Sequence, residues 1–451
     1  MLAWPSGDEM TASGTTAPLG DAAGHQGHAP VGLIGATALV VGSMVGAGIY
    51  ILPVGLGAVG SISILGWIAA TAAALAIGGM FAWLGVAAPC AKGLPGYVQA
   101  GLGPFFGVQT AVAYWVNNWV GNVAVALAAA GAVGYLAPAL AGPGARLMLT
   151  LASIWLAVAA SWIGPRMVAR IEGLTLAIGL APVLVAATLG WFAFHPSVFL
   201  ASWNPQGLST SSAIGASALT AFWAFLGVEC AAATAGVVRD PARNVPRATL
   251  MGVGVVAVLY IAACSVLMGI LPATALAKSA APFAEAGQTA LGVGLAALIA
   301  ACSLFRAQGC LTGWTLVTSE TSRSGADEGV FPRVFCTRPG ERASAVNLAT
   351  TGGLMTAVAI GTATPSLGRQ FGVLADISVI LSLYAYVLAG GSLIRLSGGL
   401  TLTRKLAARL TAFVALACSV GLIAWAKPME LLLSLAVPVA AAGLYLFLRR
   451  R

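Results

Sequence analysis

Two short stretches of the chain place glycine and a polar or charged residue inside long apolar runs. The first is Gly42–Gly48, with the sequence GSMVGAG, and the second is Phe222–Cys230, with the sequence FWAFLGVEC. Glycine costs a helix about 1 kcal/mol relative to alanine, so both stretches favour unwinding. An unwound segment frees backbone N–H and C=O groups, and the half-helix that follows it attracts a carboxylate at its N-terminus. This chemistry suits the binding of a small charged molecule.

Each stretch also allows a structural interpretation. Gly42 and Gly46 have the G-x-x-x-G spacing that lets two membrane helices pack closely. In the second stretch, the carboxylate of Glu229 could simply bond a broken helix. A carboxylate inside an apolar run is usually functional, however, and shielding from water favours its neutral form. We therefore expect a process that uses Glu229 to depend on pH.

Three asparagines and a tryptophan could contact the other end of a bound molecule. Asn118 and Asn122 are one helical turn apart and share a face, whereas Asn117 points about 100° away. We expect Asn118 to line a pocket with Asn122 and Asn117 to face a neighbouring helix; the alternative is that both adjacent amides bond other helices. Trp314 offers an aromatic face for a cation, although the residue alone favours packing or an interfacial anchor.

These residues belong to a chain whose composition is typical of a membrane protein. Of 451 residues, 59% are hydrophobic and 8% are charged, against roughly 25% charged in soluble domains. A transmembrane helix needs about 20 apolar residues. Twelve runs of about that length are predicted, at 32–58, 62–87, 105–137, 147–164, 171–194, 212–238, 248–272, 287–319, 344–362, 371–394, 407–426 and 429–448. The two glycine-containing stretches fall in the first and the sixth run.

The basic residues predict the orientation of these spans. With a cytoplasmic N-terminus, 17 Lys and Arg residues fall on the cytoplasmic side and 4 on the outside, and Arg306 alone lies inside a span. The outer four are Arg146, Lys278, Arg369 and Lys427. Cytoplasmic loops of membrane proteins are rich in Lys and Arg, so both termini are predicted to be cytoplasmic. The net charge of +9 is explained by an anionic leaflet, and no nucleic-acid partner is predicted.

The remaining features indicate no cofactor. Residues 1–30 lack Lys, Arg and a long apolar core, so they are predicted to be a disordered cytoplasmic tail rather than a signal peptide. The seven cysteines are scattered without C-x-x-C spacing and are interpreted as packing residues. His25 and His28 lie in the tail, and His195 lies at a helix end. We predict no metal site and no cofactor.

From about Val31 to its C-terminus, the chain resembles the amino acid, polyamine and organocation (APC) superfamily of transporters, and within it the bacterial arginine/agmatine antiporter subfamily. The stretches that carry the resemblance are Gly42–Gly48, Gly103–Phe105, Tyr114–Trp115, Trp119–Asn122, Gly164–Pro165, Trp223–Glu229, Ala235–Pro246, Gly313–Thr315 and Ala326–Pro332.

The resemblance implies an all-α membrane fold with broken helices 1 and 6. Ten core helices would form two inverted five-helix repeats, at about 31–195 and 211–397, followed by peripheral helices at about 405–448, in a single domain of residues 31–451. Such proteins often form homodimers. The implied activity is exchange of amino acids or amines across the bacterial inner membrane by alternating access.

The resemblance also implies roles for individual residues. Ala47 and Gly48 would hold a substrate carboxylate, next to Ser43. The backbone carbonyls that would take the α-amino group are those near Met44, Trp223 and Leu226. Trp314 would lie against the substrate side chain, and Asn122 and Ser378 would bond its distal polar end. The gate and proton sensor would be formed by Tyr114, Glu229 and Tyr386.

Several residues depart from the subfamily pattern. Ser43 and Ala47 replace Asn and Ser in the first break, and Asn117 and Asn118 replace Ala and Cys. Arg306 and Asp376 are charges that the subfamily lacks in these spans. The distal half of the pocket is therefore rebuilt, and a proton- or sodium-coupled permease for a different amino acid, neutral ones included, remains the alternative. Glu229, Arg306 and Asp376 are too scattered for a recognisable catalytic set, so no enzyme is predicted.

Overall fold

The computed structural model describes residues 31–91, 93–230, 238–337, 343–364 and 366–449. These residues form helices and, apart from one isolated bridge between Val31 and Val238, no β-structure. The predicted tail at 1–30 and part of the Ala235–Pro246 motif lie outside the described residues.

Nine of the described helices are long and apolar enough to cross a membrane. They are α3 (Ser63–Ala87), α5 (Pro104–Leu136), α6 (Pro143–Trp162), α7 (Pro165–Thr188), α11 (Pro241–Ile270), α14 (Val293–Asp327), α16 (Leu367–Leu396), α17 (Leu402–Ile423) and α18 (Pro428–Arg449). Several begin with proline, which suits the first helical position because the N–H that it lacks would have no partner there. Before α5 and α7, Gly103 and Gly164 make the turn with φ of 92° and 113°.

The three other predicted spans are shorter or interrupted. The first consists of α1 (Leu33–Met44), the 3-10 turn η1 (Ala47–Tyr50) and α2 (Leu52–Val59). The sixth contains α9 (Thr210–Phe222) and the 3-10 turn η4 (Trp223–Phe225). The ninth is α15 (Ala345–Gly361), an apolar helix of 17 residues. The all-α membrane fold and the two broken helices predicted from the sequence are confirmed.

One predicted span crosses a turn between two helices of the structure. The run 287–319 crosses the boundary between α13 (Pro282–Leu291) and α14, which Gly292 separates with φ of 89°. Apolar residues continue on both sides of Gly292, so hydropathy alone does not reveal the turn. As a result, α14 starts later than predicted and extends to Asp327.

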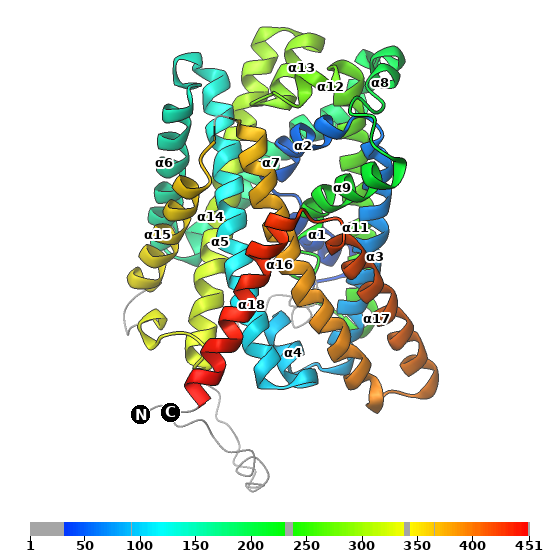
Figure 1. Cartoon of the computed structure of the whole chain (residues 1–451), viewed down its shortest axis with the longest axis vertical. Coiled ribbons are helices and arrows are strands. Elements are labelled where there is room, and N and C mark those ends of the chain that lie inside the picture. The colour runs from blue at the N-terminus through cyan, green and yellow to red at the C-terminus, as the bar shows by residue number, and fades with distance from the viewer. Residues whose placement is uncertain (1–30, 92, 231–237, 338–342, 365, 450–451) are drawn as a thin grey trace, which may run out of the picture.

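Short helices cover the two ends of the bundle. α8 (Pro196–Ala201), α12 (Ala273–Leu276) and α13 lie at the upper end, and α4 (Gly93–Leu102) lies at the lower end (Figure 1). Further 3-10 turns among the described residues are η2 (Pro138–Leu140), η3 (Leu189–Ala193), η6 (Arg333–Phe335) and η7 (Ser397–Gly399). The breaks between α1 and α2 and after α9 fall near the middle of the molecule's height.

Small residues let the central helices approach each other closely. A Cβ atom at Gly66 of α3 would lie 2.1 Å from Ser217 Oγ of α9, and one at Gly309 of α14 would lie 1.8 Å from Thr175 Oγ1 of α7. Close backbone approach favours helix association in lipid, where the hydrophobic effect does not drive it. Outside this core, α17 packs on α3 and α16, and α18 packs on α5 and α16. The boundaries of the two repeats stay a prediction.

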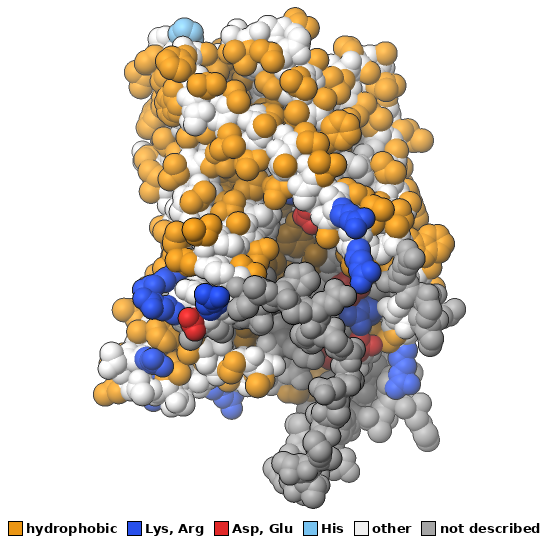
Figure 2. All heavy atoms as spheres, turned by 180° about the vertical axis from the view of Figure 1, so that it is seen from behind, with side chains coloured by type: hydrophobic (Ala, Val, Ile, Leu, Met, Phe, Trp, Pro, Cys, Tyr) orange, Lys and Arg blue, Asp and Glu red, His pale blue; other side chains and the backbone are white. Residues whose placement is uncertain are grey.

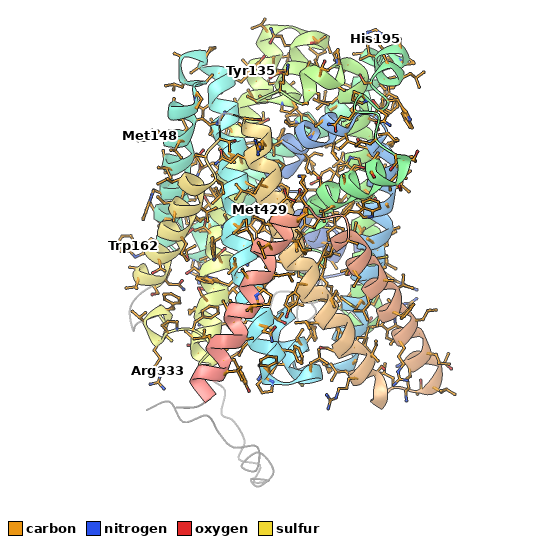
Figure 3. The ribbon with its side chains drawn as sticks, in the orientation of Figure 1. Tyr135, Met148, Trp162, His195, Arg333 and Met429 are labelled. Atoms are coloured by element: carbon orange, nitrogen blue, oxygen red, sulfur yellow. The ribbon has the colours of Figure 1, made fainter. Side chains whose placement is uncertain are left out.

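Charged side chains are unevenly distributed along the bundle. The face seen in Figure 2 has Lys and Arg in its lower half, whereas its upper half is mostly hydrophobic. Figure 3 places His195 and Tyr135 at the upper end and Arg333 at the lower end. This asymmetry is that of a membrane protein whose lower end is cytoplasmic, and the orientation itself stays a prediction.

Candidate functional site

A cavity lies where the two broken helices meet. Its lining residues come from the first break, α5, the second break, α11 and α14. They are Ser43, Met44, Gly46, Ala47, Gly48, Ile49, Asn117, Asn118, Gly121, Asn122, Val125, Trp223, Ala224, Leu226, Glu229, Tyr260, Cys310 and Trp314. Among these described lining residues, Glu229 carries the only formal charge.

The first break begins after Met44, where α1 ends. Val45 has ψ of 78° and Gly46 is extended, with φ of −94° and ψ of −168°. The carbonyl of Met44 accepts a 2.8 Å hydrogen bond from the N–H of Gly46 and a 3.1 Å hydrogen bond from Tyr260 Oη. The unwound segment predicted from the glycines is therefore present, and Tyr260 supports it. Gly46 also packs closely, because a Cβ there would lie 3.2 Å from Cys310 Sγ, whereas a Cβ at Gly42 would lie at an ordinary 3.6 Å from Leu176 Cδ2. The G-x-x-x-G interpretation of this pair therefore stays a prediction.

The second break requires glycine for two reasons. Gly227 has φ of 100°, a conformation that other residues rarely adopt. A Cβ atom there would also lie 2.7 Å from the carbonyl oxygen of Ser43. The hydroxyl of Ser43 donates a 3.3 Å hydrogen bond to the carbonyl of Gly227. The two breaks are thus in direct contact, although 184 positions separate these residues in the sequence.

Three donors converge on the buried carboxylate of Glu229. Tyr114 Oη donates to Oε1 over 3.0 Å, and Tyr386 Oη donates to Oε2 over 2.6 Å. The backbone N–H of Gly227 donates to Oε2 over 3.1 Å. Both carboxylate oxygens are therefore held by hydrogen bonds from the protein. The structure brings together the residues that the resemblance implied for a gate, from α5, α16 and the second break; their gating role stays a prediction.

All three asparagines of α5 line the cavity, including Asn117, which was expected to face a neighbouring helix. Asn117 Nδ2 donates 3.2 Å to Asn118 Oδ1, and Asn122 Nδ2 lies 3.4 Å from Thr318 Oγ1. The expectation for Asn117 fails because the cavity follows enough of the α5 surface to reach side chains about 100° apart. Asn118 Nδ2 is buried and has no hydrogen-bond partner among the described residues.

Two tryptophans form apolar walls of the cavity. Trp223 packs edge-on against Phe371, with ring centroids 5.2 Å apart, and Trp314 comes from α14. Ser378 is not among the described lining residues. Its hydroxyl instead donates 3.3 Å to the backbone carbonyl of Asn117. Its implied contact with the distal end of a substrate stays untested.

Some lining residues were missed in the sequence. Tyr260 of α11 and Cys310 of α14 lie in apolar runs where a tyrosine or a cysteine normally packs, so no local signal distinguished them. The two unexpected charges lie outside the lining: Asp376 Oδ2 is 3.6 Å from Lys427 Nζ, and Arg306 bonds the first break. Within the described residues, no three His, Cys, Asp or Glu side chains gather as metal ligands.

The chain is similar in sequence to one protein family and to several known transporters. A family model described as amino acid permease matches residues 31–439, which include both breaks. The cadaverine/lysine antiporter of Escherichia coli (strain K12) is 33% identical over 395 residues, covering 86% of this chain and 87% of the antiporter. The putrescine transporter PotE of the same strain is 32% identical over 364 residues, covering 81% and 83%. The putrescine transporter PotE of Haemophilus influenzae is 32% identical over 363 residues, covering 80% and 83%.

Proposed function

We propose, from the premise that the chain belongs to the amino acid permease family of the APC superfamily, that it exchanges cationic amino acids and diamines across the membrane by alternating access. The family resemblance expected from the sequence is confirmed. Its relatives are transporters rather than enzymes, and the chain is a multi-pass membrane protein. We further propose a bacterial inner-membrane location with both termini in the cytoplasm.

The composition of the cavity is the observation that carries the proposal. One carboxylate, three carboxamides and two indoles line it, and no Lys or Arg is among its described lining residues. Carboxylate and amide oxygens accept hydrogen bonds from an ammonium group, and an indole face attracts a cation. A cationic amine is therefore better matched to this cavity than an anion is.

The first break supports binding of an amino acid as well as a diamine. The N–H groups at the start of η1 lack intrahelical acceptors, and we propose that those of Ala47 and Gly48 receive a substrate carboxylate. The carbonyls near Met44, Trp223 and Leu226 would receive an α-amino group. A diamine has no carboxylate and would use only the amine contacts.

The molecules for which the relatives are named indicate which cationic substrates to consider. The antiporter relative is named for lysine and cadaverine, and the other two relatives are named for putrescine. These molecules share an unbranched carbon chain with an amine at its end. We therefore frame the substrate as a linear cationic amino acid or its decarboxylated amine; arginine and agmatine belong to the same class and stay candidates.

Counterflow in proteoliposomes tests substrate and mechanism together. Vesicles holding the purified protein are loaded with lysine, ornithine, arginine, cadaverine, putrescine, agmatine, leucine or buffer, and uptake of labelled lysine or putrescine is measured. We expect rapid uptake only with an internal cationic partner. Uptake that needs an imposed sodium or proton gradient and no internal partner would favour the coupled permease, and preference for leucine would favour a neutral substrate.

A further inference from the structure

Arg306 is a buried cation that does not line the cavity, so contact with a bound substrate does not explain its position. It lies on α14, its side chain is 2% exposed, and it is not among the lining residues. Its Nη2 atom donates a 2.9 Å hydrogen bond to the backbone carbonyl of Val45. Val45 is the residue directly after α1, where the first helix is interrupted. The guanidinium therefore lies at the C-terminal end of a half-helix.

The neighbouring helix makes room for this particular side chain. A Cβ atom at Gly179 of α7 would lie 2.4 Å from Arg306 Cβ, 2.6 Å from Cγ and 2.9 Å from Cδ. No side chain larger than hydrogen fits at Gly179 while the arginine crosses α7 at this point. The hydroxyl of Tyr50, in η1, donates to the carbonyl of the same glycine. The end of the first break, α7 and α14 thus meet around the arginine.

The charge of Arg306 is only partly paired. Among the described residues, its ion-pair partner is Glu172, whose Oε1 atom lies 4.0 Å from Nη2 and whose side chain is 37% exposed. The Nε and Nη1 atoms of Arg306 are buried and have no hydrogen-bond partner among the described residues. A buried arginine with a purely structural role would normally have its donors satisfied. The close partner here is the negative end of the α1 dipole.

The oxygen atoms around Nη2 are those that a small cation would use. In transporters with broken helices, unwound carbonyls and the C-terminal ends of half-helices coordinate the coupling ion. Val45 supplies such a carbonyl, and Glu172 supplies a carboxylate, a preferred ligand type of hard cations. In this chain the positive charge at that point is covalently attached to α14.

We propose that Arg306 is a tethered cation that takes the place of a coupling ion at the end of α1, so that substrate binding needs no sodium. The guanidinium holds the broken helix in its binding geometry through Val45, with Glu172 as the partial counter-ion. The inference rests on the proposed transport function and deepens it. It names a positioning residue outside the cavity that would let the protein bind substrate without a coupling ion.

Removing the guanidinium should expose a site for a mobile cation. Arg306→Ala and wild-type protein are compared by thermal unfolding in detergent and by lysine and putrescine binding. Each is measured in choline, sodium, lithium, potassium and guanidinium chloride at equal ionic strength. We expect Arg306→Ala to lose at least tenfold in substrate affinity in choline and to regain most of it with guanidinium or sodium. The same cations should raise its unfolding temperature, and wild-type protein should show neither effect.

A matched control separates this role from loss of charge in general. Arg323 lies on the same helix and is partly exposed, with its guanidinium paired to Glu320 and Asp327. Arg323→Ala should leave the cation response unchanged, and Arg306→Lys, which keeps a tethered charge, should stay independent of sodium. The proposal is overturned if a folded Arg306→Ala binds substrate as wild type does in choline, or if no cation restores it. Because unfolding temperature needs no substrate, a cation effect there would stand even if the proposed substrates were wrong.

Discussion

The indole of Trp223 lies where a side chain at Gly48 would have to be. A Cβ atom at Gly48 would be 2.1 Å from Trp223 Cζ3 and 2.6 Å from Cε3. The backbone of the first break is therefore packed directly on the aromatic ring of the second. Together with the hydrogen bond from Ser43 Oγ to the Gly227 carbonyl, this contact packs the two broken helices into one unit.

Gly48→Ala should push the first break away from Trp223 of the second break without unfolding the protein. The methyl group must push back either the indole or the first break, and overpacking of this kind costs about 1–3 kcal/mol. We expect substrate affinity to fall by roughly tenfold or more, measured by binding in detergent. Gly42→Ala is the matched control on α1, because its Cβ would lie at an ordinary 3.6 Å from Leu176 Cδ2. Equal affinities for the two variants would show that the contact is unimportant for binding.

The hydrogen bonds around Glu229 predict a dependence of exchange on pH. Ionised Glu229 accepts from Tyr114, Tyr386 and the N–H of Gly227, whereas protonation turns one acceptor oxygen into a donor. Glu229→Gln should flatten the pH profile of exchange, and Tyr386→Phe should keep a pH response while changing the rate. If Glu229→Gln keeps the native profile in proteoliposomes, the carboxylate has only a structural role.

Parts of this fold could be predicted because glycines or charged residues interrupt apolar runs of the sequence. Both helix breaks were predicted because Gly48 and Gly227 lie in otherwise apolar runs. The family resemblance placed Tyr114 and Tyr386 with Glu229, and both contact it; their gating role stays a prediction. The contact between the breaks could not be predicted, because it joins residues far apart in the chain. Tyr260 was missed for the same reason, since its role depends on the Met44 carbonyl that it contacts.

The orientation predicted from the basic residues can be tested by labelling. In a variant whose seven native cysteines are replaced, a single cysteine is introduced beside Arg404 or beside Arg146. A membrane-impermeant maleimide added to whole cells should label only the second site, and inside-out vesicles should label only the first. Charge asymmetry sets the topology of such proteins. The reverse labelling pattern would contradict a cytoplasmic C-terminus and a cytoplasmic position for Arg404.

Trp314 should distinguish a cationic from a neutral substrate. An indole attracts a desolvated cation by about 2 kcal/mol, a phenyl ring less, and an aliphatic side chain not at all. Affinity for lysine or putrescine should therefore fall from the native protein to Trp314→Phe and again to Trp314→Leu, which we would measure by competition binding. Equal losses in the two variants would indicate a contact of shape alone and would favour a neutral substrate.

The unpaired amide of Asn118 should set the order in which substrates compete. Its Nδ2 atom is buried without a partner, whereas its Oδ1 accepts from Asn117. A buried donor left unsatisfied costs about 1–3 kcal/mol, so a substrate that supplies an acceptor gains about that amount over one that does not. Sites built from buried polar groups discriminate strongly for this reason.

Asn118→Ala should therefore change the ranking of lysine, ornithine, arginine, cadaverine, putrescine and leucine by roughly five- to a hundredfold, with a smaller change in maximal rate. Asn117→Ala is the comparison, because Asn117 orients its neighbour through a 3.2 Å hydrogen bond. It should shift the ranking in the same direction but by less, and it should also lower the unfolding temperature. The ranking is measured by competition against labelled lysine in proteoliposomes. An unchanged order in Asn118→Ala would show that α5 forms a wall of the cavity without selecting its substrate.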